Sequence, residues 1–146
     1  MRIADVMRTR LVAVAPSDAV REAIRRMVEA GIGSVAVCEG PRLVGIFTER
    51  DVLHLAGTAA VLDELRVGEV MSTRLVTVGP DDDLLAAARL MGERQIRHLP
   101  VLEGENLLGI VGIRDVLGAL AERLWQAHDE EAHETVRELL ARPARS

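Results

Sequence analysis

Apolar residues along the chain follow two different periods in a fixed order. Short apolar runs at 11–14 and 35–38, rich in β-branched residues, predict strands. Between them apolar residues recur at helical spacing from Val20 to Val28, and Gly31 suits the left-handed residue that ends a helix. A third apolar run at 43–47 follows the turn 39–42, and a second helix starts after it. The pattern predicts a β-α-β-β-α unit.

The same order of elements returns 64 residues further on. Residues 4–53 align with 68–117 without a gap, and 24 of these 50 pairs are identical. This repeat predicts strands at 75–78, 99–102 and 107–111 and a helix at 84–91. One unit is too small to bury both faces of its sheet, so the copies should pack about a pseudo-twofold axis with paired clefts between them. We divide the chain into repeats at 1–58 and 59–120 and a helical extension at 121–146.

Polar segments before the predicted helices favour capping. Pro16, Ser17 and Asp18 combine turn and N-cap chemistry, and the acidic run 81–83 suits a helix start better than a metal site.

Cys38 is the only cysteine, which excludes an internal disulfide. We expect it in a core strand of a protein kept in a reducing, cytoplasmic location.

Composition narrows the class of protein. The 146 residues are 49% hydrophobic and 28% charged, as in a soluble globular chain. Eighteen basic against 23 acidic residues give a net charge of −5, which argues against a nucleic-acid binder. With no Tyr, one Phe and one Trp, a bound base would have to be held by aliphatic side chains and backbone. No membrane span or signal peptide is expected.

Three blocks of sequence carry a family resemblance. They read GIFTERDVL at 45–53, IRHLPV at 96–101 and GIVGIRDVL at 109–117. Together with the duplication they resemble a tandem pair of cystathionine-β-synthase (CBS) domains, the Bateman module, over residues 1 to about 120. The resemblance implies an α+β fold of two packed repeats. It also implies a homodimeric regulatory module that catalyses no reaction and binds AMP, ADP, ATP or another adenosyl ligand between its repeats.

Thr48 and Asp51 have two interpretations. The pattern Thr-x-x-Asp before an apolar helix is a capping box, in which both side chains satisfy backbone donors. The resemblance implies instead that Asp51 accepts hydrogen bonds from ribose hydroxyls. The Thr48 hydroxyl can also donate to an anion drawn to the helix start. Capping and binding can coexist.

Arg97 and His98 also admit two interpretations. On their own they fit a solvated basic strand end as well as a ligand contact. Arginine offers a planar fork to phosphate, whereas histidine contributes charge only when protonated. The first site that the resemblance implies consists of Thr48, Asp51, Ile96, Arg97 and His98, with the segment from Met71 to Val76 along its base.

A second, weaker site is implied at the pseudo-twofold position. It joins Gly112 and Asp115 to Ile32, Gly33 and Ser34, with residues 7–12 along its base. Because this site lacks the threonine, arginine and histidine of the first, we expect a phosphate-bearing ligand in the first site. We expect the second site to be empty or to take a less charged ligand. We expect Arg50 and Arg114, beside the two aspartates, to form ion pairs with neighbouring carboxylates, and a phosphate contact is the alternative for each.

The residues after 117 have no counterpart in the first repeat. Apolar positions at helical spacing, broken by the polar stretch 128–131, predict a helix that ends by Pro143 and covers its own domain, a second subunit or a partner. An alternative function is a structural interaction module whose clefts are empty and whose C-terminal helix recruits a partner. The weakest hypothesis is a metal enzyme using His98, His128 and His133, and we expect no metal site.

Overall fold

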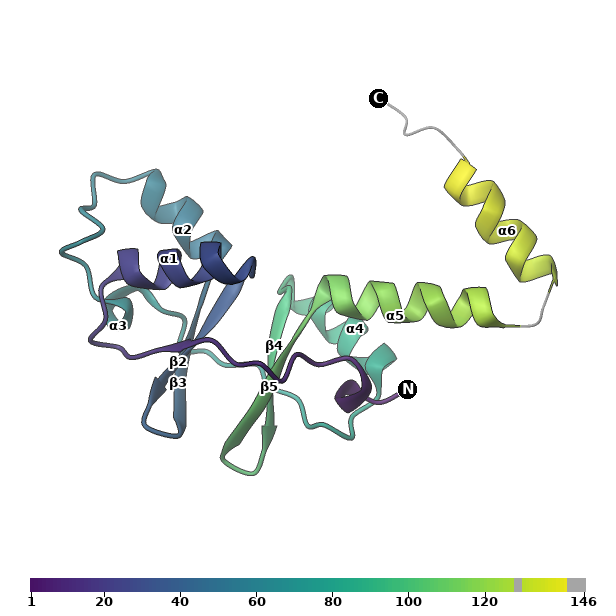
Figure 1. The fold of residues 1–146 in the computed structure, drawn as a ribbon, viewed down its shortest axis with the longest axis horizontal. Coiled ribbons are helices and arrows are strands. Elements are labelled where there is room, and N and C mark those ends of the chain that lie inside the picture. The colour runs from purple at the N-terminus through teal and green to yellow at the C-terminus, as the bar shows by residue number, and fades with distance from the viewer. Residues whose placement is uncertain (128–129, 142–146) are drawn as a thin grey trace.

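The computed structural model describes residues 1–127 and 130–141, and it contains the predicted unit twice. The first repeat consists of β1 (Ala13–Val14), α1 (Val20–Ala30), β2 (Ser34–Glu39), β3 (Arg42–Thr48) and α2 (Glu49–Ala56). The second consists of α4 (Leu84–Arg94), β4 (His98–Glu103), β5 (Asn106–Gly112) and α5 (Ile113–Gln126). The short helices η1 (Ile3–Asp5) and α3 (Val67–Val70) precede the repeats, and α6 (Glu130–Ala141) follows them (Figure 1). The α+β fold is confirmed.

The two sheets differ in one strand. In the first repeat β1 runs parallel to β2, which pairs antiparallel with β3. The second sheet holds only β4 and β5, so the strand predicted at 75–78 is wrong, and only Val78 forms a bridge, to Val101. The cause is Pro100, which stands where Ala36 of the first repeat donates its amide to Val12 O at 3.2 Å. Proline has no N–H, so the matching bond cannot form.

Each repeat has its own hydrophobic core, but the cores do not follow the two halves of the sequence. Phe47 and its neighbours fill the first core, which includes fully buried Val67 from the segment before the second repeat. Leu84 and Leu99 lie in the second core, which includes fully buried Ile3 from the start of the chain. The leading segment of each repeat therefore packs against the other repeat, and Figure 1 shows the N-terminus beside α4 and α5.

Backbone hydrogen bonds hold the exchanged segments in equivalent places. The Ile3 amide donates to Asp82 O at 3.0 Å, and the Val67 amide donates to Asp18 O at 2.9 Å. Both donors and both acceptors are 64 residues apart, which is the offset of the duplication. The two repeats are thus related by the pseudo-twofold that the sequence predicts.

The helix ends correct one expectation and confirm others. Asp18 does not cap α1, whose N-cap is Ala19; its Oδ2 instead accepts from the Ala15 amide at 2.8 Å and closes the turn. Asp83 does cap α4, since its Oδ2 accepts from the Ala86 amide at 3.3 Å. Gly31 ends α1 in the left-handed conformation, with φ 63°. Asp18, which is one residue before the N-cap of α1, therefore stabilises the preceding turn and not the helix start.

The C-terminal extension contains the end of α5 and the whole of α6. Figure 1 shows α5 continuing past the second sheet and α6 turning away from it. The Arg137 guanidinium lies 5.6 Å from the centre of the Trp125 ring, which ties α6 to the end of α5. His128 and Pro143 lie outside the described residues.

Among the residues that are described, no helix is long and apolar enough to cross a membrane, and no three His, Cys, Asp or Glu side chains are grouped to hold a metal.

Candidate functional site

A groove of about 1540 Å³ lies between the two repeats. Both helices that follow a hairpin, α2 and α5, begin at this groove, and the segments before β2 and β4 also line it. The structure therefore brings together residues far apart in sequence. The predicted site residues that line the groove are Ile32, Gly33, Ser34, Thr48, Asp51, Val76, Ile96, Arg97, His98, Gly112 and Asp115.

Four residues of the two predicted base segments are not among those lining the groove, namely Met7, Thr9, Thr73 and Met71. Met71 lies at the start of its segment. It is half-buried and packs against the first core. Its sulfur would lie 2.5 Å from a Cβ built at Gly45, so the missing side chain of Gly45 makes room for it. Met71 thus packs against Gly45 in the first core, whereas its neighbours Ser72, Arg74 and Val76 line the groove.

At the start of α2, Thr48 and Asp51 form a local cap. The Asp51 Oδ2 accepts from the Thr48 amide at 2.8 Å and from the Thr48 hydroxyl at 3.2 Å. Asp51 is half-buried and lines the groove. The capping interpretation is thus confirmed, and it leaves the carboxylate at the groove wall, where it can accept further bonds.

At the start of α5, Asp115 has a different partner. Gly112 provides no hydroxyl there, and the Asp115 Oδ2 accepts from Nε of Arg8 at 3.2 Å. Arg8 comes from the exchanged N-terminal segment and also lines the groove. The two aspartates therefore occupy equivalent places with unequal surroundings.

His98 lines the groove between Gly33 and Gly112. A Cβ at Gly33 would be 3.2 Å from its Nε2, and a Cβ at Gly112 would be 3.6 Å from its Cδ2. The imidazole thus lies against residues that the sequence assigns to the second site. Burial lowers the pKa of His98 below 6.5, opposed by the charge of Glu49. Glu49, which the sequence analysis did not single out, sits over Gly33.

Positive charge is concentrated in the groove. Six arginines and three carboxylates line it, although the whole chain carries a net charge of −5. Arg8 has its ion pair with Asp115; none of the other five comes within 4.0 Å of a carboxylate in the described part of the chain. The expectation that Arg50 and Arg114 pair with neighbouring carboxylates is therefore wrong. The five arginines are Arg10, Arg50, Arg74, Arg97 and Arg114.

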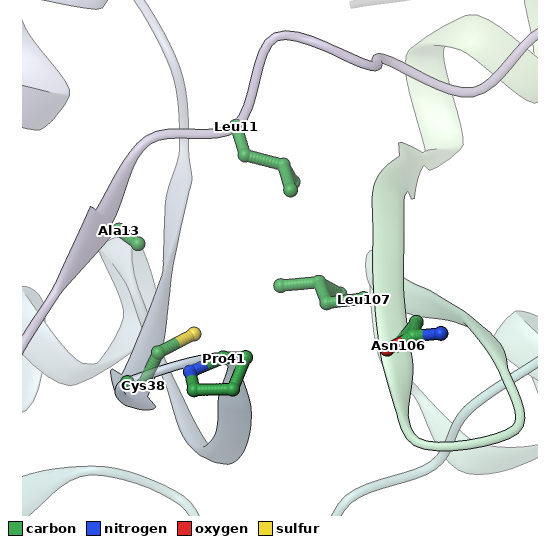
Figure 2. A pocket seen from close by; sticks show the side chains of 7 residues that line it. Leu11, Ala13, Cys38, Pro41, Asn106 and Leu107 are labelled. Carbon is green, nitrogen blue, oxygen red and sulfur yellow. The ribbon is translucent and has the colours of Figure 1, made fainter.

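A smaller pocket of about 290 Å³ lies between the two hairpins. Figure 2 shows Leu11 and Leu107 extending into the same space from opposite repeats, with Cys38 and Pro41 at its edge. Cys38 is only half-buried, and burial raises the pKa of its thiol. The thiol is therefore neutral near pH 7 and behaves as part of an apolar wall.

Comparison with known proteins places this architecture in a family. The family model of the CBS domain matches the chain twice, at residues 3–57 and 67–122. The chain belongs to the CBS-domain family, with two copies of the domain, as the three sequence blocks indicate.

Individual relatives differ in how much of their length the chain covers. A 33.4 kDa protein of Thermofilum pendens is 48% identical over 98 residues, which are 66% of this chain and 32% of that protein. The CBS domain-containing protein YhcV of Bacillus subtilis is 38% identical over 115 residues, 78% of this chain and 81% of YhcV. The crystal structure of CBSX2 in complex with AMP is similar at a TM-score of 0.71 and 28% identity, covering 83% of this chain and 96% of CBSX2.

Proposed function

We propose that this chain is a regulatory module that binds an adenine nucleotide in the groove between its CBS repeats. The observation that carries the proposal is the group of five arginines in the groove without a carboxylate partner among the described residues. Arginine binds phosphate through a planar fork of donors. The starts of α2 and α5 add the positive ends of two helix dipoles. A ligand with phosphate groups matches this field.

The nucleoside part of the ligand is proposed from Asp51 and from the family. An aspartate at the groove wall can accept both hydroxyls of a ribose, and Thr48 adds a hydroxyl beside it. CBSX2, which is 28% identical to this chain, was crystallised with AMP. We therefore assign the ribose to Asp51 and the phosphate to Arg97, with His98 and Ile96 beside them. AMP and ATP are the first ligands to test.

Regulation requires that the ligand bind two states of the module unequally. A coupling of about 1–3 kcal/mol is typical of such systems.

A homodimer is the assembly that we propose for the module in both states. It is supported by Leu53 and Leu117, which occupy equivalent positions on α2 and α5 and are 71% and 58% exposed.

Isothermal titration calorimetry of the full chain with AMP, ADP, ATP, NAD and S-adenosylmethionine tests the proposal. We expect binding of at least one nucleotide, and we expect Asp51→Ala to weaken it by about tenfold or more, as a lost bond to a charged group does. Asp115→Ala should weaken it less. Equal losses would contradict the assignment to Asp51. Circular dichroism of each variant checks that the fold is intact.

The alternative is an interaction module that binds no nucleotide. The exposed apolar side chains of α2 and α5 favour it, because such a surface suits a partner protein or a second copy. The absence of heat with every ligand, from a folded protein that is dimeric by analytical ultracentrifugation, would support this alternative and exclude nucleotide sensing.

A further inference from the structure

Residues 8 and 72 occupy equivalent places in the exchanged segments but carry different side chains. The Arg8 amide donates to Ile110 O at 3.0 Å and Arg8 O accepts from the Ile110 amide at 3.2 Å. Ser72 makes the same two bonds with Ile46, at 2.9 and 3.0 Å. The backbones therefore match, and the difference between the two places lies in the side chain.

The two side chains treat the neighbouring aspartates differently. Arg8 reaches Asp115 and forms an ion pair with it at 3.2 Å, with the two side chains 53% and 27% exposed. Serine carries no positive charge and forms no ion pair at the other end, and Asp51 has no cation within 4.0 Å among the described residues. One carboxylate is thus neutralised by the chain itself, and the other is held only by neutral donors.

This difference matters because both carboxylates line the groove. A ribose that approaches Asp115 has to compete with a guanidinium that is covalently part of the same molecule. A ribose that approaches Asp51 meets Thr48 instead, whose bonds to Oδ2 do not neutralise the carboxylate. The wall at Asp115 also lacks the hydroxyl, because residue 112 is glycine.

We infer that Arg8 determines the specificity of the groove by weakening ribose binding at its Asp115 half, so that a nucleoside binds first at Asp51. This inference rests on the proposed function and adds to it the residue that makes the two halves unequal. Ser72, which is equivalent to Arg8, leaves Asp51 without an ion pair and so allows ribose to bind there. Because positions 8 and 72 are equivalent in the duplication, each of the two side chains can be tested at the position of the other.

Variants in which one aspartate is removed isolate each half. In the Asp51→Ala background, Arg8→Ser should tighten AMP binding at the remaining half by about two- to fivefold, which is the range set by an exposed ion pair. Adenosine, which carries no phosphate, should show at least as large a gain because it loses no attraction to Arg8. In the Asp115→Ala background, Ser72→Arg should weaken AMP binding by a similar factor.

Two arginines serve as controls in the Asp51→Ala background. Arg21 has a surface ion pair with Asp63 at 2.7 Å, is 59% exposed and is not among the groove residues. Arg21→Ser should leave AMP binding unchanged. Arg10 lines the groove without a carboxylate partner in the described chain, so Arg10→Ser should weaken AMP binding.

Calorimetry with AMP and adenosine separates the outcomes. Tighter binding after Arg8→Ser supports the inference, and so does binding that appears only in that variant. Unchanged or weaker binding overturns it, the weaker case identifying Arg8 as a phosphate contact. If the unmodified chain binds two AMP molecules equally, the inference fails while the proposed function stands. If no protein in the series binds either compound, both fail.

Discussion

Ile3 and Val67 allow a direct test of the exchanged packing. Both side chains are fully buried, Ile3 in the core of the second repeat and Val67 in the core of the first. Truncating a buried isoleucine to alanine costs about 2–5 kcal/mol. In a chain of this length each kcal/mol lowers the melting temperature by about 3 °C. We therefore expect Ile3→Ala to lower it by about 6–15 °C, and Val67→Ala somewhat less.

Hydrogen exchange shows which repeat each residue stabilises. Ile3→Ala should raise the exchange rates of amides in β4 and β5, although residue 3 belongs by sequence to the first half. Val67→Ala should do the same in β2 and β3. Val28→Ala is the matched control, because Val28 is 76% exposed and its truncation should change the free energy of unfolding by about 0.5 kcal/mol or less.

Two results would refute this reasoning. A loss of less than about 1 kcal/mol on Ile3→Ala would show that the N-terminal segment is not part of a core. Faster exchange confined to β2 and β3 in that variant would show that the segment stabilises its own repeat. Urea unfolding followed by circular dichroism supplies the free energies for all three variants.

Three further predictions concern single positions. Gly45→Ala should cost about 1–3 kcal/mol in urea unfolding, because the new Cβ would lie 2.5 Å from the Met71 sulfur and 3.1 Å from Ser72 O, whereas Gly118→Ala in α5 meets open space and should stabilise by up to about 1 kcal/mol. Gln95 ends α4 with φ 53°, a backbone conformation that is strained for a residue with a side chain. Gln95→Gly should therefore raise the melting temperature by a few degrees, and a lower melting temperature would contradict this strain. Because burial lowers the pKa of His98 below 6.5, the unfolded chain takes up a proton before the folded one as the pH falls below about 6.5. Stability should therefore decrease there, and His98→Gln should flatten that decrease in urea titrations.

The elements of the fold could be predicted because they depend on local pattern. Apolar spacing defines α1 and α4, and the turn glycine with its positive φ at Gly40 separates β2 from β3. The strand that failed to form shows the limit of this reasoning. Residues 75–78 have the composition of a strand, but pairing depends on the neighbouring strand, where Pro100 removes a donor.

The groove could be predicted only in part. The offset of 64 located Asp51 and Asp115 as equivalent positions, and the structure places both at the groove. The ion pair of Arg8 with Asp115 joins residues 107 apart, and no local spacing reports it. The signal that the sequence offered was serine at position 72, where the equivalent position 8 holds arginine. Repeats that differ at equivalent positions of a binding groove cannot bind a ligand in the same way.

The crossed leading segments mean that the covalent halves of this protein are not its folding halves. A cut between residues 58 and 59 would leave each fragment holding a piece that completes the other, so the fragments should reassemble when mixed. One repeat expressed alone could complete itself only by swapping segments with another copy. Joining two copies in one polypeptide keeps the exchange partners at millimolar effective concentration. The duplication thus turns a dilution-sensitive association into an intramolecular one.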